Sequence, residues 1–324
     1  MRNFILILCG LALASCEHSS SDTPAEVRDF KQDMRNFVIG ISDYAKASKP
    51  NFAIIPQNGI SLVTVDGELS GAPATAYLNA IDGNGQEDLF YGYDNDDEQT
   101  PIPVTSDLVH FLDISKNQGN TILTIDYCST PNKMDNSYAF NFARGYVSFA
   151  ASDRSLATIP NYPATPFGEN NNVITSLSQA KNHLFFINAE NYATKSAYIN
   201  AVTATNYDVL ITDLFFNDGT AFTPAEVEML RNKANGGKRL VICYMSIGEA
   251  EDYRYYWNSS WTTSKPSWLD AENPSWAGNY KVKYWNPEWQ SIIYGNNNSY
   301  LSKILAAGYD GVYLDIIDAF EYYE

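Results

Sequence analysis

Histidine and cysteine are scarce in this chain. Its 324 residues include three histidines, His18, His110 and His183, and their spacing is not that of a metal site. Cys128 and Cys243 each lie inside an apolar stretch, where a packed thiol is commoner than a disulfide or a metal ligand. The sequence therefore predicts no zinc site, no Ser-His-Asp triad and no resident cofactor.

Positive charge is also in short supply. Lys and Arg number 21 against 38 Asp and Glu, which gives a formal net charge of -17. Because phosphate binding needs a basic surface, we exclude nucleic acid as a partner. An acidic surface suits a neutral or cationic ligand, although the same charge can serve only to keep an exported protein soluble. No Gly-rich phosphate loop follows any apolar stretch, which argues against a nucleotide-binding open sheet.

The apolar stretch near the start of the chain is too short to span a bilayer. It covers 4–13, follows Arg2, and leads into Leu-Ala-Ser-Cys at 13–16. This arrangement resembles the cleavage box of bacterial lipoproteins. The resemblance implies a signal peptide at 1–15, a lipid on Cys16 that anchors the exported protein to a membrane of the cell envelope, and a flexible tether at 16–24. An ordinary signal peptide with an incidental cysteine is the alternative.

Apolar stretches recur along the chain and alternate with helical patterns or long loops. Eight of them are typical of buried parallel strands: 51–58, 77–82, 121–127, 145–151, 184–188, 207–213, 239–248 and 308–317. This pattern predicts an α/β fold, specifically a (β/α)₈ TIM barrel. We expect the barrel to occupy 25–324 as a single domain, with a Pro-, Asn- and Ser-rich linker at 161–182.

Two helix starts have the same clear signal. Thr-Pro-Ala-Glu occurs at 23–26 and again at 223–226, which provides an N-cap, a first-turn proline and a capping-box glutamate each time. We expect the second of these helices to end at Gly236-Gly237, and a short helix to begin near Pro287. The chain thus starts with a helix and ends on a strand. In a closed barrel the first helix can follow the last strand in space, whereas an open sheet does not explain this order.

Acidic residues follow most of the predicted strands. The carboxyl ends of parallel strands form one rim, where barrel enzymes bind ligands and carry out chemistry. The acidic residues at this rim are Asp82, Glu87, Asp126, Asp213, Glu249, Glu251, Asp315 and Asp318. Glycoside hydrolysis needs two opposed carboxylates, one that donates a proton and one that acts as nucleophile or base. The pattern alone does not select the pair, and any single member can instead be a helix cap or a loop acceptor.

Three other features bear on this rim. A Mg²⁺ or Ca²⁺ site formed by Asp126, Asp315 and Asp318 is the weaker alternative, because no ligand-spacing motif such as an EF-hand loop is present. Arg254 is expected to pair with a rim carboxylate and to shift its pKa. Aromatic residues crowd the long loop at 253–289, where flat rings suit the apolar faces of sugars; the alternative for each ring is packing of the loop onto the barrel.

Several long motifs resemble a known family. GEAEDYRYYW (248–257), PSWL (266–269), WAGNYKVKYWNPEW (276–289) and GYDGVYLDIIDAFEYY (308–323) are similar to glycoside hydrolase family 114-like barrels, the relatives of endo-α-1,4-polygalactosaminidase. NFAIIPQNG (51–59), AIDGNGQEDLFY (80–91) and TILTIDYCS (121–129) resemble the same family. The order of the motifs is exchanged, so the resemblance implies a circular permutant. The family's C-terminal half would lie at 25–160 and its N-terminal half at 183–324.

The resemblance also implies a catalytic pair and a function. Asp315 in VYLDIID would be the nucleophile and Glu87 in GNGQEDLFY the acid/base, with Asp318 and Asp82 as close neighbours in sequence. The expected substrate-binding residues are Gln57, Asn58, Asp82, Tyr91, Asp126, Tyr127, Asp213, Tyr244, Glu249, Glu251, Arg254, Trp257, Tyr284, Trp285 and Asp318. The expected activity is cleavage of a poly- or oligosaccharide, with an amino-sugar polymer as one candidate. The alternatives are a non-catalytic carbohydrate-binding lipoprotein and a cell-envelope interaction protein; the sequence makes no prediction of oligomeric state.

Overall fold

The computed structural model describes residues 28–324. The predicted signal peptide, Cys16, the tether and the Thr-Pro-Ala-Glu motif at 23–26 lie outside these residues. The first helix that the structure describes, α1 (Phe30–Ser48), begins with Asp29 as its N-cap, whose carboxylate accepts a hydrogen bond from the backbone N–H of Gln32 at 2.8 Å. Within the described residues, none of the helices is long and apolar enough to cross a membrane.

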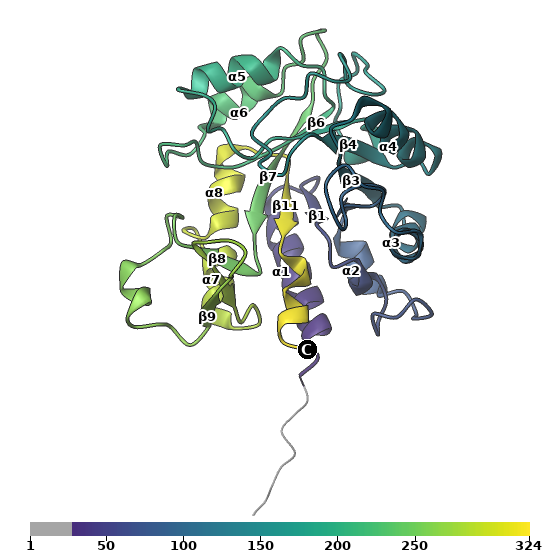
Figure 1. The fold of residues 1–324 in the computed structure, drawn as a ribbon. Coiled ribbons are helices and arrows are strands. Elements are labelled where there is room, and N and C mark those ends of the chain that lie inside the picture. The colour runs from purple at the N-terminus through teal and green to yellow at the C-terminus, as the bar shows by residue number, and fades with distance from the viewer. Residues whose placement is uncertain (1–27) are drawn as a thin grey trace, which may run out of the picture.

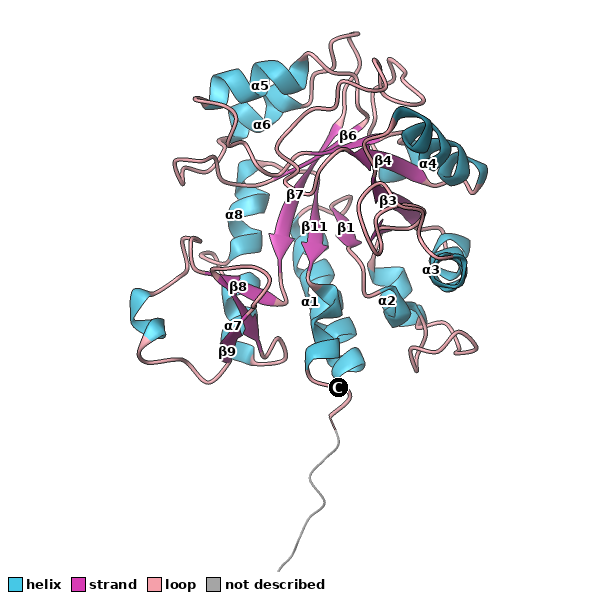
Figure 2. Ribbon diagram, in the orientation of Figure 1, coloured by secondary structure: helices cyan, strands magenta, loops and turns pink. Residues whose placement is uncertain are grey.

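Eight parallel strands form two sheets at the centre of the molecule (Figures 1 and 2). The five-stranded sheet has the order β1 (Ala53–Pro56), β11 (Gly311–Asp315), β7 (Leu240–Ser246), β6 (Val209–Thr212) and β5 (His183–Phe185). The three-stranded sheet has the order β2 (Gly83–Glu87), β3 (Thr121–Tyr127) and β4 (Val147–Ala151). A parallel bridge between Gln57 and Gly85 joins the two sheets beside β1, and β4 lies next to β5 on the other side. This α/β arrangement is compatible with a TIM-barrel-like fold.

Helices surround the strands (Figure 2). They are α2 (Thr75–Ala80), α3 (Ile102–Asn117), α4 (Pro131–Ala143), α5 (Lys195–Thr203), α6 (Pro224–Leu230), α7 (Pro287–Ile293) and α8 (Tyr300–Ala307), with 3₁₀ turns at Ile60–Val63, Leu177–Gln179, Ser259–Thr262 and Ile317–Tyr322. The predicted capping box of α6 is confirmed, since Thr223 and Glu226 each bond to the other's backbone N–H. The helix ends at Leu230, however, and not at Gly236-Gly237, while α7 begins at Pro287 as predicted.

One predicted strand is wrong. The stretch 77–82 forms most of α2, because Tyr77, Leu78 and Ile81 bury one face at helical spacing. The strand comes directly afterwards, in the polar sequence GNGQE of β2. Glycine is required there by close packing: a Cβ atom at Gly85 would lie 2.0 Å from the hydroxyl oxygen of Tyr313. Each of the other predicted strand stretches contains or overlaps one of the parallel strands.

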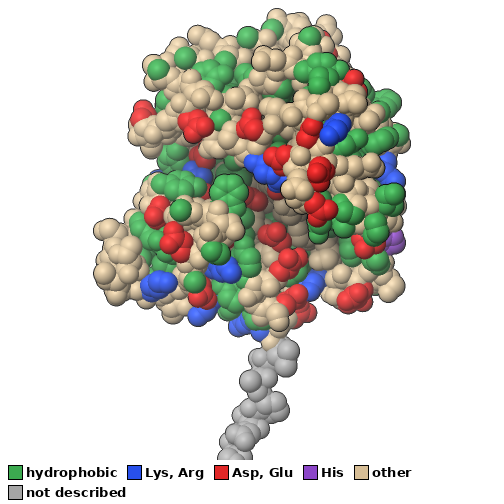
Figure 3. All heavy atoms as spheres, in the orientation of Figure 1, with side chains coloured by type: hydrophobic (Ala, Val, Ile, Leu, Met, Phe, Trp, Pro, Cys, Tyr) green, Lys and Arg blue, Asp and Glu red, His purple; other side chains and the backbone are tan. Residues whose placement is uncertain are grey.

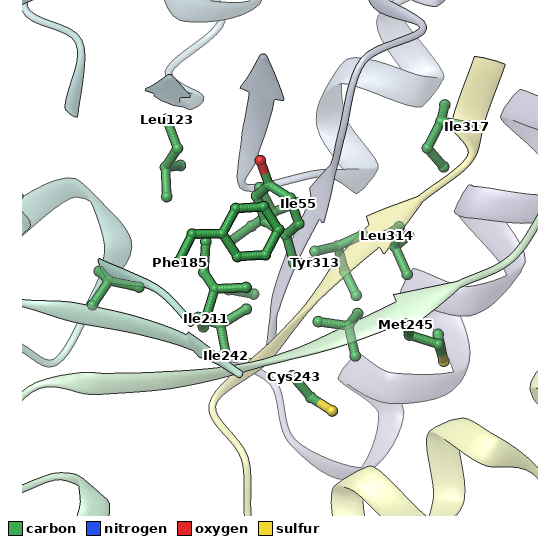
Figure 4. Close-up of a cluster of buried hydrophobic side chains, with 14 of the residues drawn as sticks. Ile55, Leu123, Phe185, Ile211, Ile242, Cys243, Met245, Tyr313, Leu314 and Ile317 are labelled. Atoms are coloured by element: carbon green, nitrogen blue, oxygen red, sulfur yellow. The ribbon is translucent and has the colours of Figure 1, made fainter. Parts of the chain in front are cut away.

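Residues from both sheets pack into one hydrophobic core (Figure 4). Leu123 of the three-stranded sheet points toward Phe185 and Tyr313 of the five-stranded sheet, and the rings of these two aromatic residues lie 5.2 Å apart. Cys128 and Cys243 are buried free thiols, as predicted. The core therefore holds the carboxyl ends of strands from both sheets in fixed positions around a common centre.

The long loop predicted at 253–289 contributes two strands to a small antiparallel sheet, and the third strand directly precedes the loop. Its strands, in spatial order, are β8 (Glu249–Glu251), β10 (Asn279–Val282) and β9 (Leu269–Glu272). Strand β8 follows the carboxyl end of β7 directly, so this small sheet lies beside the rim of the parallel strands (Figure 1). The predicted linker at 161–182 is irregular except for one 3₁₀ turn.

Helix α1 lies beside the end of the chain. It packs against the 3₁₀ helix Ile317–Tyr322, which follows β11, and Lys31 forms an ion pair of 2.6 Å with Glu324 (Figure 1). The first described helix thus follows the last strand in space, as the helix-first and strand-last order predicts.

Candidate active site

A cavity of about 510 Å³ lies at the carboxyl ends of the parallel strands. Ten of the predicted site residues line it: Gln57, Asn58, Glu87, Tyr127, Asp213, Tyr244, Glu251, Arg254, Asp315 and Asp318. In the space-filling view, acidic side chains gather around a hollow near the middle of the molecule, with basic side chains at its upper edge (Figure 3). The cavity combines side chains from the two parallel sheets and from the small antiparallel sheet.

Glu87, the last residue of β2, is held by two donors. Tyr127 donates its hydroxyl to Oε1 at 2.5 Å, and Asn58 donates its amide to Oε2 at 2.9 Å. Burial and the nearby Glu87 charge raise the pKa of Tyr127 well above its usual value, so this phenol stays protonated and keeps donating. These two hydrogen bonds fix the orientation of the carboxylate toward the cavity.

Asp315, the last residue of β11, is the second carboxylate of the predicted pair. Tyr244 donates its hydroxyl to Oδ2 at 2.5 Å, and the backbone N–H of Ile316 donates to Oδ1 at 2.9 Å. Burial, followed by the negative charge of Glu87, raises the pKa of Asp315 to about 7 and outweighs these two hydrogen bonds. The carboxyl group therefore changes its protonation state in the physiological pH range.

The backbone turns sharply just after these carboxylates. Asn58, Asp88 and Ile316 follow the carboxyl ends of the neighbouring strands β1, β2 and β11, and all three have positive φ angles, of 59°, 56° and 58°. Asparagine and aspartate tolerate this left-handed region, whereas a β-branched isoleucine adopts it at a cost of about 1–3 kcal/mol. The surrounding packing must therefore hold Ile316 in place, and this fixes the direction in which Asp315 enters the cavity.

Arg254 pairs with a second group of carboxylates in the cavity. Its guanidinium lies 2.7 Å from Asp213 Oδ2 and 2.5 Å from Glu251 Oε2, and all three side chains are largely buried. Tyr253 also donates its hydroxyl to Glu251 Oε1 at 2.5 Å. The predicted pairing of Arg254 with a rim carboxylate is thus seen twice, and its single positive charge offsets one of the two negative charges.

The remaining carboxylates of the cavity have no cationic partner. Within residues 28–324, Glu87, Asp315 and Asp318 form no ion pair, since the cavity's two arginines pair with other carboxylates. Burial and the neighbouring charge of Glu321 raise the pKa of Asp318 to about 6. A site with several uncompensated carboxylates attracts cations and hydrogen-bond donors.

Some predicted site residues do not line this cavity. Asp126 points outward, because Tyr127 points inward and side chains alternate along a strand; it is fully buried and accepts hydrogen bonds from Ser137 and from the backbone of Phe90. Asp82 precedes β2 and so lies at its amino end, where it accepts a bond from the backbone of Ile54. This separation removes Asp126 from the predicted Mg²⁺ or Ca²⁺ set. Over the described part of the chain, no group of three or more His, Cys, Asp and Glu residues is placed to hold a metal ion.

The other predicted residues outside the cavity lining serve packing or support. Tyr91 is buried in the core, and Trp257 packs against Tyr280 with ring centres 4.8 Å apart. Tyr284 donates its hydroxyl to the carbonyl of Phe30, and Trp285 packs on the ring of the same phenylalanine. Glu249 is fully buried and accepts hydrogen bonds from Asn273 at 2.8 Å and Tyr322 at 3.3 Å, both of which line the cavity.

Several cavity residues were not expected from the sequence. They are Arg154, Leu156, Phe185, Ile187, Asn188, Asn273, Asn279, Ile316 and Tyr322. Tyr253 and Trp276 also line the cavity and belong to the aromatic loop that was considered for contact with sugars. Arg154 stacks over the ring of Tyr127, 4.0 Å from its centre, and pairs with Asp88 at 2.9 Å. The sequence could have indicated Arg154, because it lies three residues after β4, in a loop of the same rim. Asn273 and Asn279 gave no signal, because the hairpin that carries them is not predicted by the barrel pattern.

Comparison with known proteins finds a family match for the second part of the chain. The model of glycoside-hydrolase family GH114 matches residues 177–323. The predicted resemblance to this family is therefore confirmed for the segment that carries Asp213, Tyr244, Glu251, Arg254 and Asp315. The motifs around Gln57, Glu87 and Tyr127 lie outside the matched residues, so their resemblance to the family stays a prediction.

Relatives among curated proteins match a similar share of the chain. An uncharacterized protein of Methanocaldococcus jannaschii is 42% identical over 153 residues, which is 46% of this chain and 41% of that protein. Uncharacterized proteins of Deinococcus radiodurans and Thermotoga maritima are 42% and 38% identical over 123 and 125 residues, or 38% of this chain in each case. These matches span 37% and 36% of the two relatives, so the chain matches about two fifths of the length of all three proteins.

Proposed function

We propose that this protein is a glycoside hydrolase that cleaves a poly- or oligosaccharide, with Glu87 and Asp315 as its two catalytic carboxylates. The family match over residues 177–323 supports this class of activity. The observation that carries the proposal is that both carboxylates line one cavity without a cationic partner, while the cavity carboxylates Asp213 and Glu251 both pair with Arg254. A group of half-buried carboxylates without cationic partners is costly for folding alone, so a chemical role explains it best.

In the proposed mechanism, Asp315 is the nucleophile and Glu87 the acid/base. Glu87 would protonate the leaving glycosidic oxygen while Asp315 attacks the sugar carbon, and water would then release the sugar with Glu87 as the base. The pKa of Asp315 near 7 means that this group is partly protonated in the free protein at neutral pH. A cationic sugar in the cavity would favour the ionised, nucleophilic form of Asp315, because opposite charges lower a carboxyl pKa.

An amino-sugar polymer is the proposed substrate. Glu87, Asp315 and Asp318 give the cavity an uncompensated negative charge, and the whole chain has a formal net charge of -17. Both would attract a protonated amine, and the aromatic side chains Tyr253 and Trp276 at the cavity offer flat surfaces for sugar rings.

We also propose that the parallel strands close into one ring, with the two halves exchanged relative to the family. The bridge between Gln57 and Gly85, the shared core and the position of α1 beside the chain end support closure. The family match at 177–323, preceded by β1 to β4, is consistent with an exchanged order. An experimental structure in which β4 and β5 are separated by solvent would contradict closure.

Export and a lipid on Cys16 remain proposals from the sequence. Mass spectrometry of the membrane fraction should detect a lipid-modified N-terminal cysteine in the wild-type protein. Cys16→Ser should lack this modification and appear in the soluble fraction; a wild-type protein without lipid would refute the anchor.

The activity can be tested with amino-sugar polymers and three proteins. Wild type, Glu87→Gln and Asp315→Asn are incubated with α-1,4-linked polygalactosamine and with chitosan, and the products are identified by mass spectrometry. We expect cleavage by wild type and a loss of at least about 10²-fold in each variant, the lower bound for removal of an acid–base group. Binding without cleavage in all three proteins would favour the non-catalytic carbohydrate-binding alternative.

A further inference from the structure

A second pocket of about 320 Å³ adjoins the cavity. The two hollows share the lining residues Ile187, Asn188, Asp213, Tyr253 and Arg254. Side chains that face both hollows form a common wall, so a chain molecule bound in the cavity can continue past this wall into the second pocket. The second pocket is therefore placed to bind the neighbouring unit of a polymer.

The second pocket differs from the cavity in charge. Asp213 is its only acidic lining residue, and Arg254 pairs with it at 2.7 Å. These two are the charged residues in the lining and have opposite signs, so the lining itself has no net charge; Arg254 also pairs with Glu251, which lines the cavity but not this pocket. The cavity, by contrast, contains the unpaired Glu87, Asp315 and Asp318. The two hollows thus offer an anionic site and an almost neutral site side by side.

The lining of the second pocket is suited to a sugar ring. Phe215 lies 5.8 Å from Tyr255 and 6.0 Å from Tyr300, so its ring is held by two others. Tyr255 is 41% exposed and Tyr253 is 64% exposed, which leaves aromatic surface free at the mouth of the pocket. Such rings pack against the apolar face of a pyranose.

Two asparagines supply polar contacts in the same pocket. Asn217 donates its amide to the backbone carbonyl of Ala189 at 2.7 Å, and Asn188 donates its own to the carbonyl of Ser155. Over residues 28–324, neither amide oxygen accepts a hydrogen bond from a protein donor. Both oxygens are therefore available to a ligand N–H or hydroxyl group.

We infer that this pocket is a subsite for an uncharged sugar, best fitted by an N-acetylhexosamine, next to a cationic sugar in the cavity. The acetamido N–H has acceptors in Asn188 and Asn217, and its methyl group has an apolar surface in Phe215 and Tyr255. This inference rests on the proposed function. The inference narrows the proposed substrate from a uniformly charged amino-sugar chain to a partly N-acetylated one.

Tyr255 offers a clean test because it lines the second pocket and not the cavity. We compare wild type, Tyr255→Ala, Tyr255→Phe, which keeps the ring, and the control Tyr93→Ala, which removes an exposed tyrosine that lines neither hollow. The substrates are α-1,4-linked galactosamine oligosaccharides, either fully deacetylated or partly N-acetylated. Thermal unfolding of each variant verifies that it is folded.

On the partly acetylated substrate, we expect Tyr255→Ala to lower kcat/KM by about fivefold, equivalent to about 1 kcal/mol. The loss on the deacetylated substrate should be markedly smaller, and both Tyr255→Phe and Tyr93→Ala should behave as wild type. Equal losses on the two substrates, or no loss in Tyr255→Ala, would overturn the neutral subsite.

A binding measurement separates this inference from the proposed activity. Saturation-transfer NMR with N-acetylgalactosamine alone needs no hydrolysis. If wild type cleaves neither substrate, the hydrolase proposal fails. The subsite still stands if the N-acetylgalactosamine signal is strong in wild type and Tyr93→Ala and weak in Tyr255→Ala, and it falls if the three signals are equal.

Discussion

Asp315 shows how a single residue acquires a function from its surroundings. As the last residue of β11 it is half-buried, accepts two hydrogen bonds and faces the charge of Glu87. Burial and charge repulsion favour its neutral form, while the hydrogen bonds favour its ionised form. The balance raises its pKa to about 7, so modest changes in nearby charge should alter its protonation at neutral pH.

The first prediction concerns the neighbouring Asp318. If Asp315 must be ionised to act as nucleophile, kcat/KM rises with pH through about 7, the pKa of this group in the free protein. Asp318 raises the pKa of Asp315, so Asp318→Asn should move this rise to lower pH by a fraction of a pH unit. The measurement is the pH profile of kcat/KM. Asp107→Asn, on the exposed surface of α3, removes the same charge far from the cavity and should leave the profile in place; a shift to higher pH in Asp318→Asn would contradict the model.

A second prediction at this scale concerns Gly85. An alanine Cβ there would meet the hydroxyl oxygen of Tyr313 at 2.0 Å and its ring carbon at 2.4 Å. Gly85→Ala should lower the free energy of unfolding by about 1–3 kcal/mol, as overpacking does in well-filled cores. Urea denaturation measures this loss. Combining it with Tyr313→Leu should cost less than the sum of the two single changes, and strict additivity would show that the two residues do not clash.

The residue types at the rim were predictable, but their directions were not. The sequence places an acidic residue after each of several strands, yet a shift of one position reverses the side to which it points. Tyr127 therefore faces the cavity while the adjacent Asp126 faces α4. The apolar pattern places Asp82 at the carboxyl end of a strand, but the strand β2 begins after Asp82. The pattern misses β2 because the sequence of β2 is polar.

Elements with a local signal were predicted best. The α6 capping box is written in four consecutive residues, and most strands are continuous apolar runs. Strand β2 has no such run, because two of its positions must be glycine. A side chain at Gly83 or Gly85 would clash with Thr121 or Tyr313, which are distant in sequence. The apolar pattern likewise does not predict the antiparallel sheet of β8, β9 and β10, because β9 and β10 contain polar residues and are largely half-exposed or exposed.

The cap of α6 gives a prediction at the scale of the element. The Thr223 hydroxyl accepts the backbone N–H of Glu226 at 3.3 Å, while the Glu226 carboxylate accepts the N–H of Thr223 at 2.7 Å. Thr223→Ala should reduce the free energy of unfolding by about 1 kcal/mol, and Thr223→Ser, which keeps the hydroxyl, by clearly less. Thermal and urea unfolding of both variants measure the difference. Equal losses would assign the effect to the methyl group and not to the cap.

At the scale of the whole molecule, the cavity depends on both parts of the chain. Asp315 and Tyr244 belong to the segment that matches the family, whereas Glu87, Asn58 and Tyr127 come from the part before it. The strand pattern predicted the alternation of elements. It could not predict how the two sheets meet, because that contact depends on side chains such as Tyr313 that pack across the core.

The irregular segment between the two sheets is fixed by a buried ion pair. Lys233 and Asp208 lie 2.9 Å apart with no exposed side-chain surface, and Asn170 of this segment donates its amide to Asp208 at 2.9 Å. Lys233→Met should lower the free energy of unfolding by about 3–5 kcal/mol, because it leaves a buried carboxylate without its cation. Lys238→Met removes a more exposed lysine that pairs with Glu228 and should cost less than about 1 kcal/mol. Chemical denaturation of both variants tests this. Similar losses in the free energy of unfolding would show that the buried ion pair stabilises the protein no more than the exposed one.

The ion pair between Lys31 and Glu324 has a practical consequence for protein engineering. Because these two ends of the described chain meet, a short peptide could join them, and new termini could be opened in the irregular segment around 161–176. Every strand that carries a cavity side chain would then remain intact. Such a rewired gene would test directly whether the order of the two parts matters for folding, since the final contacts would be the same and only the sequence of their synthesis would change.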